Sequence, residues 1–146
     1  MVRSLVDKLR KNGVDARVDI YHLKPGFDLP QWMTNEVIIA DKVLLICDKY
    51  YVAKSDSRKG GVGWEAMIIQ GDMLFQNDNK NKYIAIVIED EIDQGLPIYM
   101  KSKYAIHWRE KEPSEDEFNE LIFHIFDCNI EPEIGSIPKF IIDKIV

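Results

Sequence analysis

The sequence predicts an α/β fold, a parallel β-sheet with helices on both faces. Residues 43–47 and 83–88 are runs of consecutive apolar residues, which is typical of strands buried on both sides. Segments in which apolar residues recur at helical spacing alternate with these runs, and the connections are short. Ligands bind such sheets beyond the carboxyl ends of the strands, so we expect a functional site there.

The first helix and its end are both marked. Leu5, Val6 and Leu9 have helical spacing, and the pair Asn12-Gly13 follows as a helix C-terminal cap. The chain is therefore predicted to open in a helix that ends at this pair.

A strand and a second helix are predicted next. Residues 14–21 alternate between apolar and polar, as a short strand does, and 24–26 is a turn sequence. Asp28 can cap the following helix, whose inward face is given by Met33 and Val37. The buried strand at 43–47 comes after this helix.

The second half repeats the pattern. A polar loop with glycines is expected over 54–63, then a helix in which apolar residues follow helical spacing. These residues are Trp64, Met67, Ile68 and Phe75. A short strand is predicted over 104–108, after the buried strand at 83–88.

The last helix has the clearest start. Ser114 and Glu117 form a capping box before a helix from about Glu115. The tail from Asn129 is predicted to be a packed, extended segment up to about Phe140, because prolines and a glycine interrupt it.

Composition limits the function. The 146 residues, 46% apolar and 30% charged, fit one globular domain over residues 1–146. A net charge of -6 offers no basic surface to a nucleic acid, and no apolar run approaches the ~20 residues that cross a bilayer. Cys47 and Cys128 show neither a CxxC spacing nor a signal peptide, so we expect reduced thiols and a cytoplasmic protein.

Glu65 is the candidate for chemistry. It is predicted to lie in the first turn of an apolar helix, directly after the glycine-rich residues 60–63. Glycines let a ligand approach the backbone, and a helix start adds free N–H groups that suit a phosphate. The alternative is that this carboxylate only opposes the helix dipole.

Two loops are expected to surround Glu65, because residues 21–27 and 48–63 leave the carboxyl ends of neighbouring strands. Aromatic side chains there could stack on a base, and basic ones could bind a diphosphate. The aromatic candidates are Tyr21, Phe27, Tyr50, Tyr51 and Trp64, and the basic ones are Lys24, Arg58 and Lys59. A purely structural role remains the alternative for each.

Other chemistries find little support. His22, His107 and His124 are scattered, so no metal site is expected. The glycine-rich segment lacks the GxxxxGK[ST] order of a P-loop, and Ser55 has no recognisable base near it in the sequence.

Five segments occur in a characteristic order and spacing. They are residues 9–19, 23–28 with Trp32-Met33, 40–47 with Tyr50, 60–65 and 132–138. Together they resemble a bacterial Toll/interleukin-1 receptor (TIR) domain, in the branch close to SEFIR domains. The resemblance extends over nearly the whole chain.

The resemblance implies a flavodoxin-like fold. It also implies, for many bacterial members, hydrolysis or cyclisation of NAD at the nicotinamide–ribose bond, often as the effector of antiphage defence. The family's catalytic glutamate corresponds to Glu65, whose carboxylate would stabilise an oxocarbenium-like ribose. NAD would be the substrate, and no cofactor is implied.

The resemblance further implies that Leu23, Lys24, Pro25, Gly26 and Phe27 form the BB loop, which mediates assembly and gates the pocket. Two protomers often complete one site in this family. Activity is therefore expected on self-association, with a fused or separate sensor domain as a further partner.

One departure concerns the start of the chain. Family members begin with a strand and a hydroxyl-rich loop, whereas this chain begins in what corresponds to the first helix. A truncated start, a sheet closed up in altered order and a strand donated by the tail or another chain would each reconcile the two. We favour truncation.

Three hypotheses follow. The first is an NAD hydrolase or cyclase that uses Glu65, with Trp64, Tyr21, Lys24, Phe27 and Tyr50 binding the substrate. The second is a non-enzymatic module that assembles through the BB loop. The third is a nucleotide-signal binder of another flavodoxin-like type.

Overall fold

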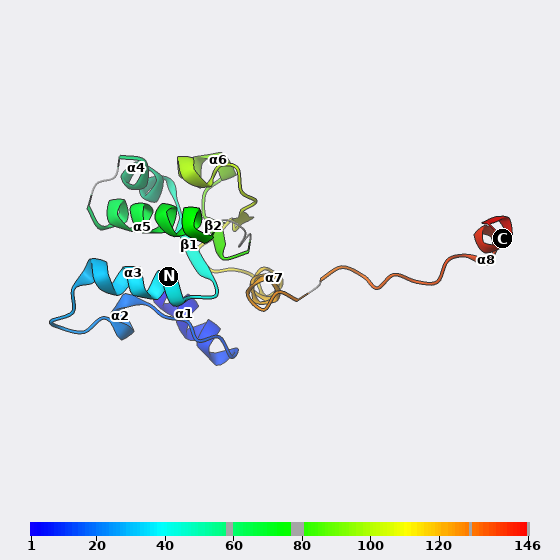
Figure 1. Cartoon of the computed structure of the whole chain (residues 1–146), viewed down its shortest axis with the longest axis horizontal. Coiled ribbons are helices and arrows are strands. Elements are labelled where there is room, and N and C mark those ends of the chain that lie inside the picture. The colour runs from blue at the N-terminus through cyan, green and yellow to red at the C-terminus, as the bar shows by residue number, and fades with distance from the viewer. Residues whose placement is uncertain (58–59, 77–80, 129, 146) are drawn as a thin grey trace.

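The computed structural model confirms the predicted α/β architecture. It describes residues 1–57, 60–76, 81–128 and 130–145, with the backbone alone for 60–64 and 76. Three parallel strands form one sheet in the order β1-β2-β3, and helices pack around it (Figure 1). The elements are α1 (Val2–Lys11), α2 (Asp19–His22), α3 (Leu29–Ile39), β1 (Val43–Cys47), α4 (Lys49–Ser57), α5 (Gly60–Gln76), β2 (Tyr83–Val87), α6 (Ile92–Gly95), the 3-10 helix η1 (Ile98–Met100), β3 (Ile106–His107), α7 (Glu115–Ile125) and α8 (Lys139–Ile145).

The strands lie where the apolar runs predicted them. Val43 pairs with Tyr83 and Cys47 with Val87, so β1 and β2 are in register along their whole length. The shorter β3 pairs with the carboxyl half of β2 and lies inside the predicted strand 104–108. The carboxyl ends of β1 and β2 therefore meet at one edge of the sheet.

A separate apolar cluster covers each face of the sheet. One cluster joins Leu45, Cys47 and Ala85 of the strands to Ile69 of α5 and Met100 of η1. The other is on the opposite face, and its buried members are Leu5, Leu9, Ile86, Ile106, Trp108, Phe118 and Leu121. Side chains alternate along a strand, so the neighbouring residues of β2 enter different clusters.

The predicted helix caps are present. The Asp28 carboxylate accepts a hydrogen bond from Gln31 N at 3.0 Å, and Ser114 and Glu117 form both bonds of the capping box. Asn12 caps α1, and Gly13 follows at φ +85°, a conformation that glycine adopts without strain.

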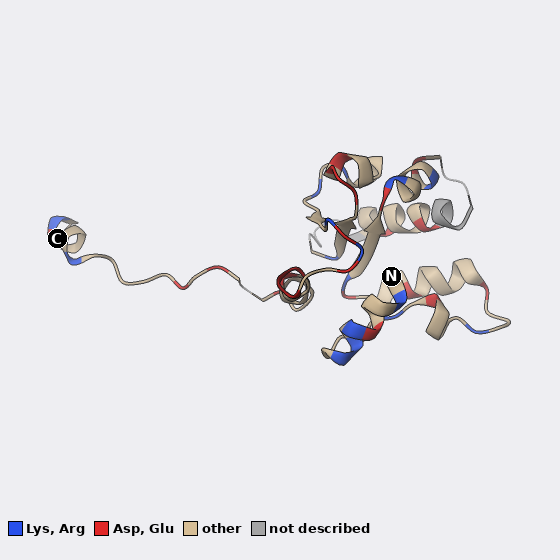
Figure 2. Cartoon of the chain, turned by 180° about the vertical axis from the view of Figure 1, so that it is seen from behind, with Lys and Arg blue, Asp and Glu red and all other residues tan. Residues whose placement is uncertain are grey.

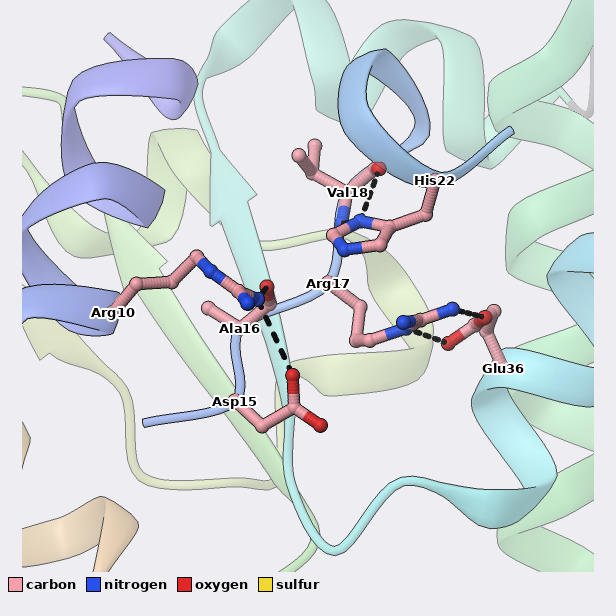
Figure 3. Close-up of polar contacts among 7 residues, drawn as sticks. All are labelled: Arg10, Asp15, Ala16, Arg17, Val18, His22 and Glu36. Atoms are coloured by element: carbon pink, nitrogen blue, oxygen red, sulfur yellow. Dashed lines mark hydrogen bonds and ion pairs between the residues drawn. The ribbon is translucent and has the colours of Figure 1, made fainter. Parts of the chain in front are cut away.

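The predicted strand over 14–21 is wrong. Residues 14–18 form neither a helix nor a strand and lie outside the sheet, and α2 begins at Asp19. Side chains bind this segment in place of a neighbouring strand (Figure 3). Arg10 donates to the Ala16 carbonyl at 2.7 Å, and Arg17 forms a two-pronged ion pair with Glu36 of α3. Within the described residues β1 is thus an edge strand of the sheet.

The glycine-rich segment and the tail also differ from expectation. Most of the predicted loop over 54–63 is helical, because α4 reaches Ser57 and α5 starts at Gly60. On α5, Met67 and Phe75 are exposed, and the buried side is formed by Ala66 and Ile69. The tail is extended up to α8, as predicted, but it runs away from the body (Figure 1) and is not packed against it.

An ion pair joins α1 to α7. Figure 2 shows basic residues toward the end of α1 and acidic residues on α7. Lys8 Nζ lies 2.9 Å from Glu115 Oε1 and 4.2 Å from the centre of the Phe118 ring. In the described part of the chain, no helix is both long and apolar enough to cross a membrane.

Candidate functional site

Glu65 lies at the carboxyl edge of the sheet, as predicted, but not in a first helical turn. Because α5 begins at Gly60, Glu65 is in its second turn, away from the free N–H groups of the helix start. Burial, together with the nearby carboxylates of Glu65 and Asp48, raises the pKa of the Cys47 thiol to about 12. Cys47 ends β1, so this effect places Glu65 beside the strand end.

Two tyrosines accompany the carboxylate. The Tyr51 hydroxyl of α4 lies 3.4 Å from Glu65 Oε1 and 3.1 Å from the Tyr99 hydroxyl of η1. Ser55, one turn after Tyr51 on α4, is 3% exposed and lies close enough to Tyr99 to affect its pKa. The result is a small polar cluster inside apolar surroundings, formed by residues of three different elements.

Local hydrogen bonds fix the two tyrosines. Asp48 caps α4 by accepting from Tyr51 N at 2.7 Å, and Glu89 accepts from Lys49 N at 2.8 Å. Asp56 at the far end of α4 accepts from Ile98 N at 3.0 Å, which holds η1 and therefore Tyr99 against this helix. Short polar residues commonly bind free backbone groups at helix ends in this way.

The electrostatics of Glu65 are unusual for a carboxylate in a folded domain. Burial raises the pKa of Glu65, the Tyr51 hydrogen bond lowers it, and the negative charge of Asp19 on α2 raises it again. Among the described residues, none of the ion pairs involves Glu65. A half-buried carboxylate without a cation is a typical feature of functional sites.

Burial also raises the pKa of both tyrosine hydroxyls, and the Glu65 charge adds to this effect. Both hydroxyls are therefore neutral across the physiological range. They can donate hydrogen bonds to an anion and cannot repel it by charge.

The structure brings only some of the predicted residues to Glu65. Tyr51 contacts the carboxylate, whereas its neighbour Tyr50 is 69% exposed and lies beneath the Lys49 ammonium group. Tyr21 turns to α1, where its hydroxyl donates to Asp7 at 2.6 Å and accepts from Arg3 at 3.0 Å.

The remaining candidates are in the BB loop or outside the residues that the structure describes. Lys24 and Phe27 are exposed on the turn at 24–27, which is closed by a 3.0 Å bond from Phe27 N to Lys24 O. The side chain of Trp64 and the residues Arg58 and Lys59 lie outside the described residues.

Sequence reasoning missed Tyr99 and Asp19. Tyr99 is in a segment with Gly95 and Pro97 that predicts only a loop. Asp19 was assigned to a strand, although its charge acts on Glu65 from the start of α2. Tyr51, in contrast, is one of the aromatic candidates that the sequence indicated.

Two hollows in the described surface lie away from Glu65. One of about 590 Å³ is bordered by Ile38, Lys42 and Asn81, and a second of about 490 Å³ by Tyr104, Ile106 and Phe123. The first is near the amino ends of β1 and β2, opposite Glu65. The described residues include no group of three or more side chains placed to bind a metal ion.

A parallel sheet with helices on both faces and a polar cluster at its carboxyl edge define a flavodoxin-like α/β domain. The sequence model of the TIR domain matches residues 1–122, so the chain belongs to the TIR family. The chain is similar to a prokaryotic SEFIR domain of known crystal structure, with 36% identity and a TM-score of 0.69 over 92% of this chain and 88% of that one. No curated protein matches the chain. The expected resemblance and fold are thus confirmed.

Proposed function

We propose that this TIR domain cleaves NAD at the nicotinamide–ribose bond, by hydrolysis or cyclisation, with Glu65 as the catalytic carboxylate. It would act as a cytoplasmic effector of antiphage defence once copies self-associate through the BB loop. The observation that supports this proposal is the state of Glu65: it is half-buried, next to the carboxyl end of β1, and hydrogen-bonded to a tyrosine, and it pairs with no cation of the described residues.

The chemistry suits such a carboxylate. Departure of nicotinamide leaves positive charge on the ribose, and a carboxylate in low-dielectric surroundings stabilises that charge more strongly than water does. A cation already bound to Glu65 would cancel this effect. The tyrosine hydroxyls leave the negative charge in place while they restrict the side chain.

The experiment is to incubate the self-associated protein with NAD and measure nicotinamide release. We expect Glu65→Gln to lower the rate by about 100-fold or more, as for other groups that stabilise transition-state charge. Glu110→Gln, which removes an exposed carboxylate from a loop, is the matched control and should keep the full rate. Equal rates for wild type and Glu65→Gln would exclude the proposal.

A second candidate is a non-enzymatic assembly module, favoured by the similarity to a SEFIR domain and by the exposed BB loop. Gly26 holds the turn at φ +90°, and Phe27 is 53% exposed at its end. For this function, Phe27→Ala and Gly26→Val should abolish association in sedimentation experiments. Glu65→Gln should then associate like the wild type, and no variant should release nicotinamide.

A further inference from the structure

We infer that Tyr51 and Tyr99 are positioning residues that form a hydrogen-bond chain on Glu65, and that the chain reverses its donor direction when Glu65 gains a proton. As a statement about catalysis, this inference rests on the proposed function of Glu65. As a statement about the three side chains, it stands on their geometry.

The distances define a linear chain of hydrogen bonds with Tyr51 in the middle. The Tyr51 hydroxyl is the central group, 3.4 Å from Glu65 Oε1 and 3.1 Å from the Tyr99 hydroxyl. The bond to Glu65 is long for an O–H···O bond, and catalytic hydrogen bonds often shorten once a ligand binds. The hydrogen bonds therefore link Tyr99 to Glu65 through Tyr51.

The number of protons on the three side chains sets which group donates in each hydrogen bond. A hydroxyl has one proton, and an ionised carboxylate only accepts. When Glu65 is ionised, Tyr51 donates to it, and Tyr99 must then donate to Tyr51. When Glu65 is protonated and donates to Tyr51, Tyr51 is free to donate to Tyr99.

Described groups on three neighbouring elements face this chain. Asp19 of α2 acts on Glu65, and Cys47 of β1 acts on both tyrosines. Ser55 of α4 lies beside Tyr99. Burial keeps the Cys47 thiol neutral, so among these described groups the charge that acts on Glu65 is that of Asp19. The charge of Asp19 opposes ionisation of Glu65, and the tyrosine chain favours it.

Removal of either hydroxyl should therefore make Glu65 a weaker acid. Tyr51→Phe removes the direct donor. Tyr99→Phe leaves that donor in place but removes the bond that polarises it, so its effect should have the same sign and be smaller. Tyr50→Phe is the matched control, because Tyr50 is the neighbouring residue on α4 and is 69% exposed.

The test is a carbon-13 NMR titration of the glutamate carboxyl groups in the full chain, with Glu65 assigned by its loss in Glu65→Gln. We expect the pKa of Glu65 to rise in Tyr51→Phe, to rise less in Tyr99→Phe and to stay unchanged in Tyr50→Phe. Amide spectra of each variant must match those of the wild type. A Tyr99→Phe protein that titrates like the wild type would overturn the chain.

The same variants separate this inference from the proposed function. If NAD is cleaved, the acidic limb of the pH profile for kcat/KM should move to higher pH in Tyr51→Phe and Tyr99→Phe, with kcat at pH 7 lower by about three- to tenfold in Tyr51→Phe. An unmoved limb in an active Tyr51→Phe protein would overturn the positioning role. If no variant cleaves NAD, the proposed function fails, and the titration still decides whether the chain exists.

Discussion

Helix α5 has two carboxylates on one face, the half-buried Glu65 and the buried Asp72, seven residues apart, and their surroundings differ. Asp72 is 2.7 Å from Lys82 Nζ, with both side chains almost fully buried, and it also accepts a bond from the Tyr83 hydroxyl. Glu65 has the Tyr51 hydroxyl and the negative charge of Asp19 near it.

The two carboxylates differ because they lie at opposite ends of the parallel strands. Lys82 and Tyr83 stand at the amino end of β2, whereas Cys47 and Tyr51 stand at the carboxyl end of β1 and just after it. The amino end of the sheet uses its carboxylate to join α5 to β2, and the charge is neutralised. The carboxyl end, where ligands bind in sheets of this kind, keeps a carboxylate that forms no ion pair with any cation among the described residues. One helix thus provides both an anchor and a candidate site.

The largest effect is expected at the anchor. Lys82→Met leaves the Asp72 charge buried without its cation, so the free energy of unfolding should fall by about 3–5 kcal/mol. Urea unfolding followed by circular dichroism measures this loss. The double variant Asp72→Asn, Lys82→Met should recover much of it, and a Lys82→Met protein as stable as the wild type would contradict the assignment.

Close backbone packing at the carboxyl edge provides a second contrast. A Cβ at Gly95 would lie 2.3 Å from Val87 Cγ1, so Gly95→Ala should cost about 1–3 kcal/mol of unfolding free energy. Gly71, beside Asp72 on α5, has open space around it, and Gly71→Ala should add about 0.5–1 kcal/mol. Thermal unfolding of the two variants should shift in opposite directions. A stabilised Gly95→Ala protein would show that α6 does not pack closely against β2.

The smallest effect on stability is expected at Glu65. At neutral pH, Glu65→Gln should leave the unfolding free energy unchanged or raise it, by less than about 1 kcal/mol. The folded-state pKa of Glu65 is raised above 4.5 by burial, so the folded state binds this proton more tightly than the unfolded state does.

The wild type should therefore lose stability relative to Glu65→Gln as the pH rises from about 4.5 through the folded-state pKa. Urea unfolding at a series of pH values measures this difference. A wild type that gains on the variant over the same range would show that Glu65 is stabilised as an anion.

The sequence predicted those parts of the fold whose causes are local. Val43–Cys47 is a strand because it is uniformly apolar, and Ser114 with Glu117 starts α7 because its capping box needs no distant partner. The strand predicted over residues 14–21 was wrong, because an alternating pattern favours an extended segment but cannot provide a neighbouring strand for it to pair with. The loop predicted at the glycines of residues 60–63 was wrong, because the helical preference of α5 as a whole outweighs their low helix propensity.

The site was predictable only in part, for a related reason. Glu65 was found from its sequence neighbours, and its position at a strand end followed from the general rule for parallel sheets. Tyr99 comes from an element 34 residues later, brought close by the Asp56 carboxylate. Lys82 lies in a polar segment that resembles a solvated loop, and only the tertiary fold shows that it is 1% exposed.

The positions of the two cysteines make the junction between body and tail chemically addressable. Cys47 is fully buried with a raised pKa, whereas Cys128 is an exposed free thiol where the extended tail leaves α7. A maleimide dye should therefore attach at one place without any engineered residue. Its fluorescence anisotropy would report the local motion of this junction, and whether added NAD or a second copy of the chain restrains it.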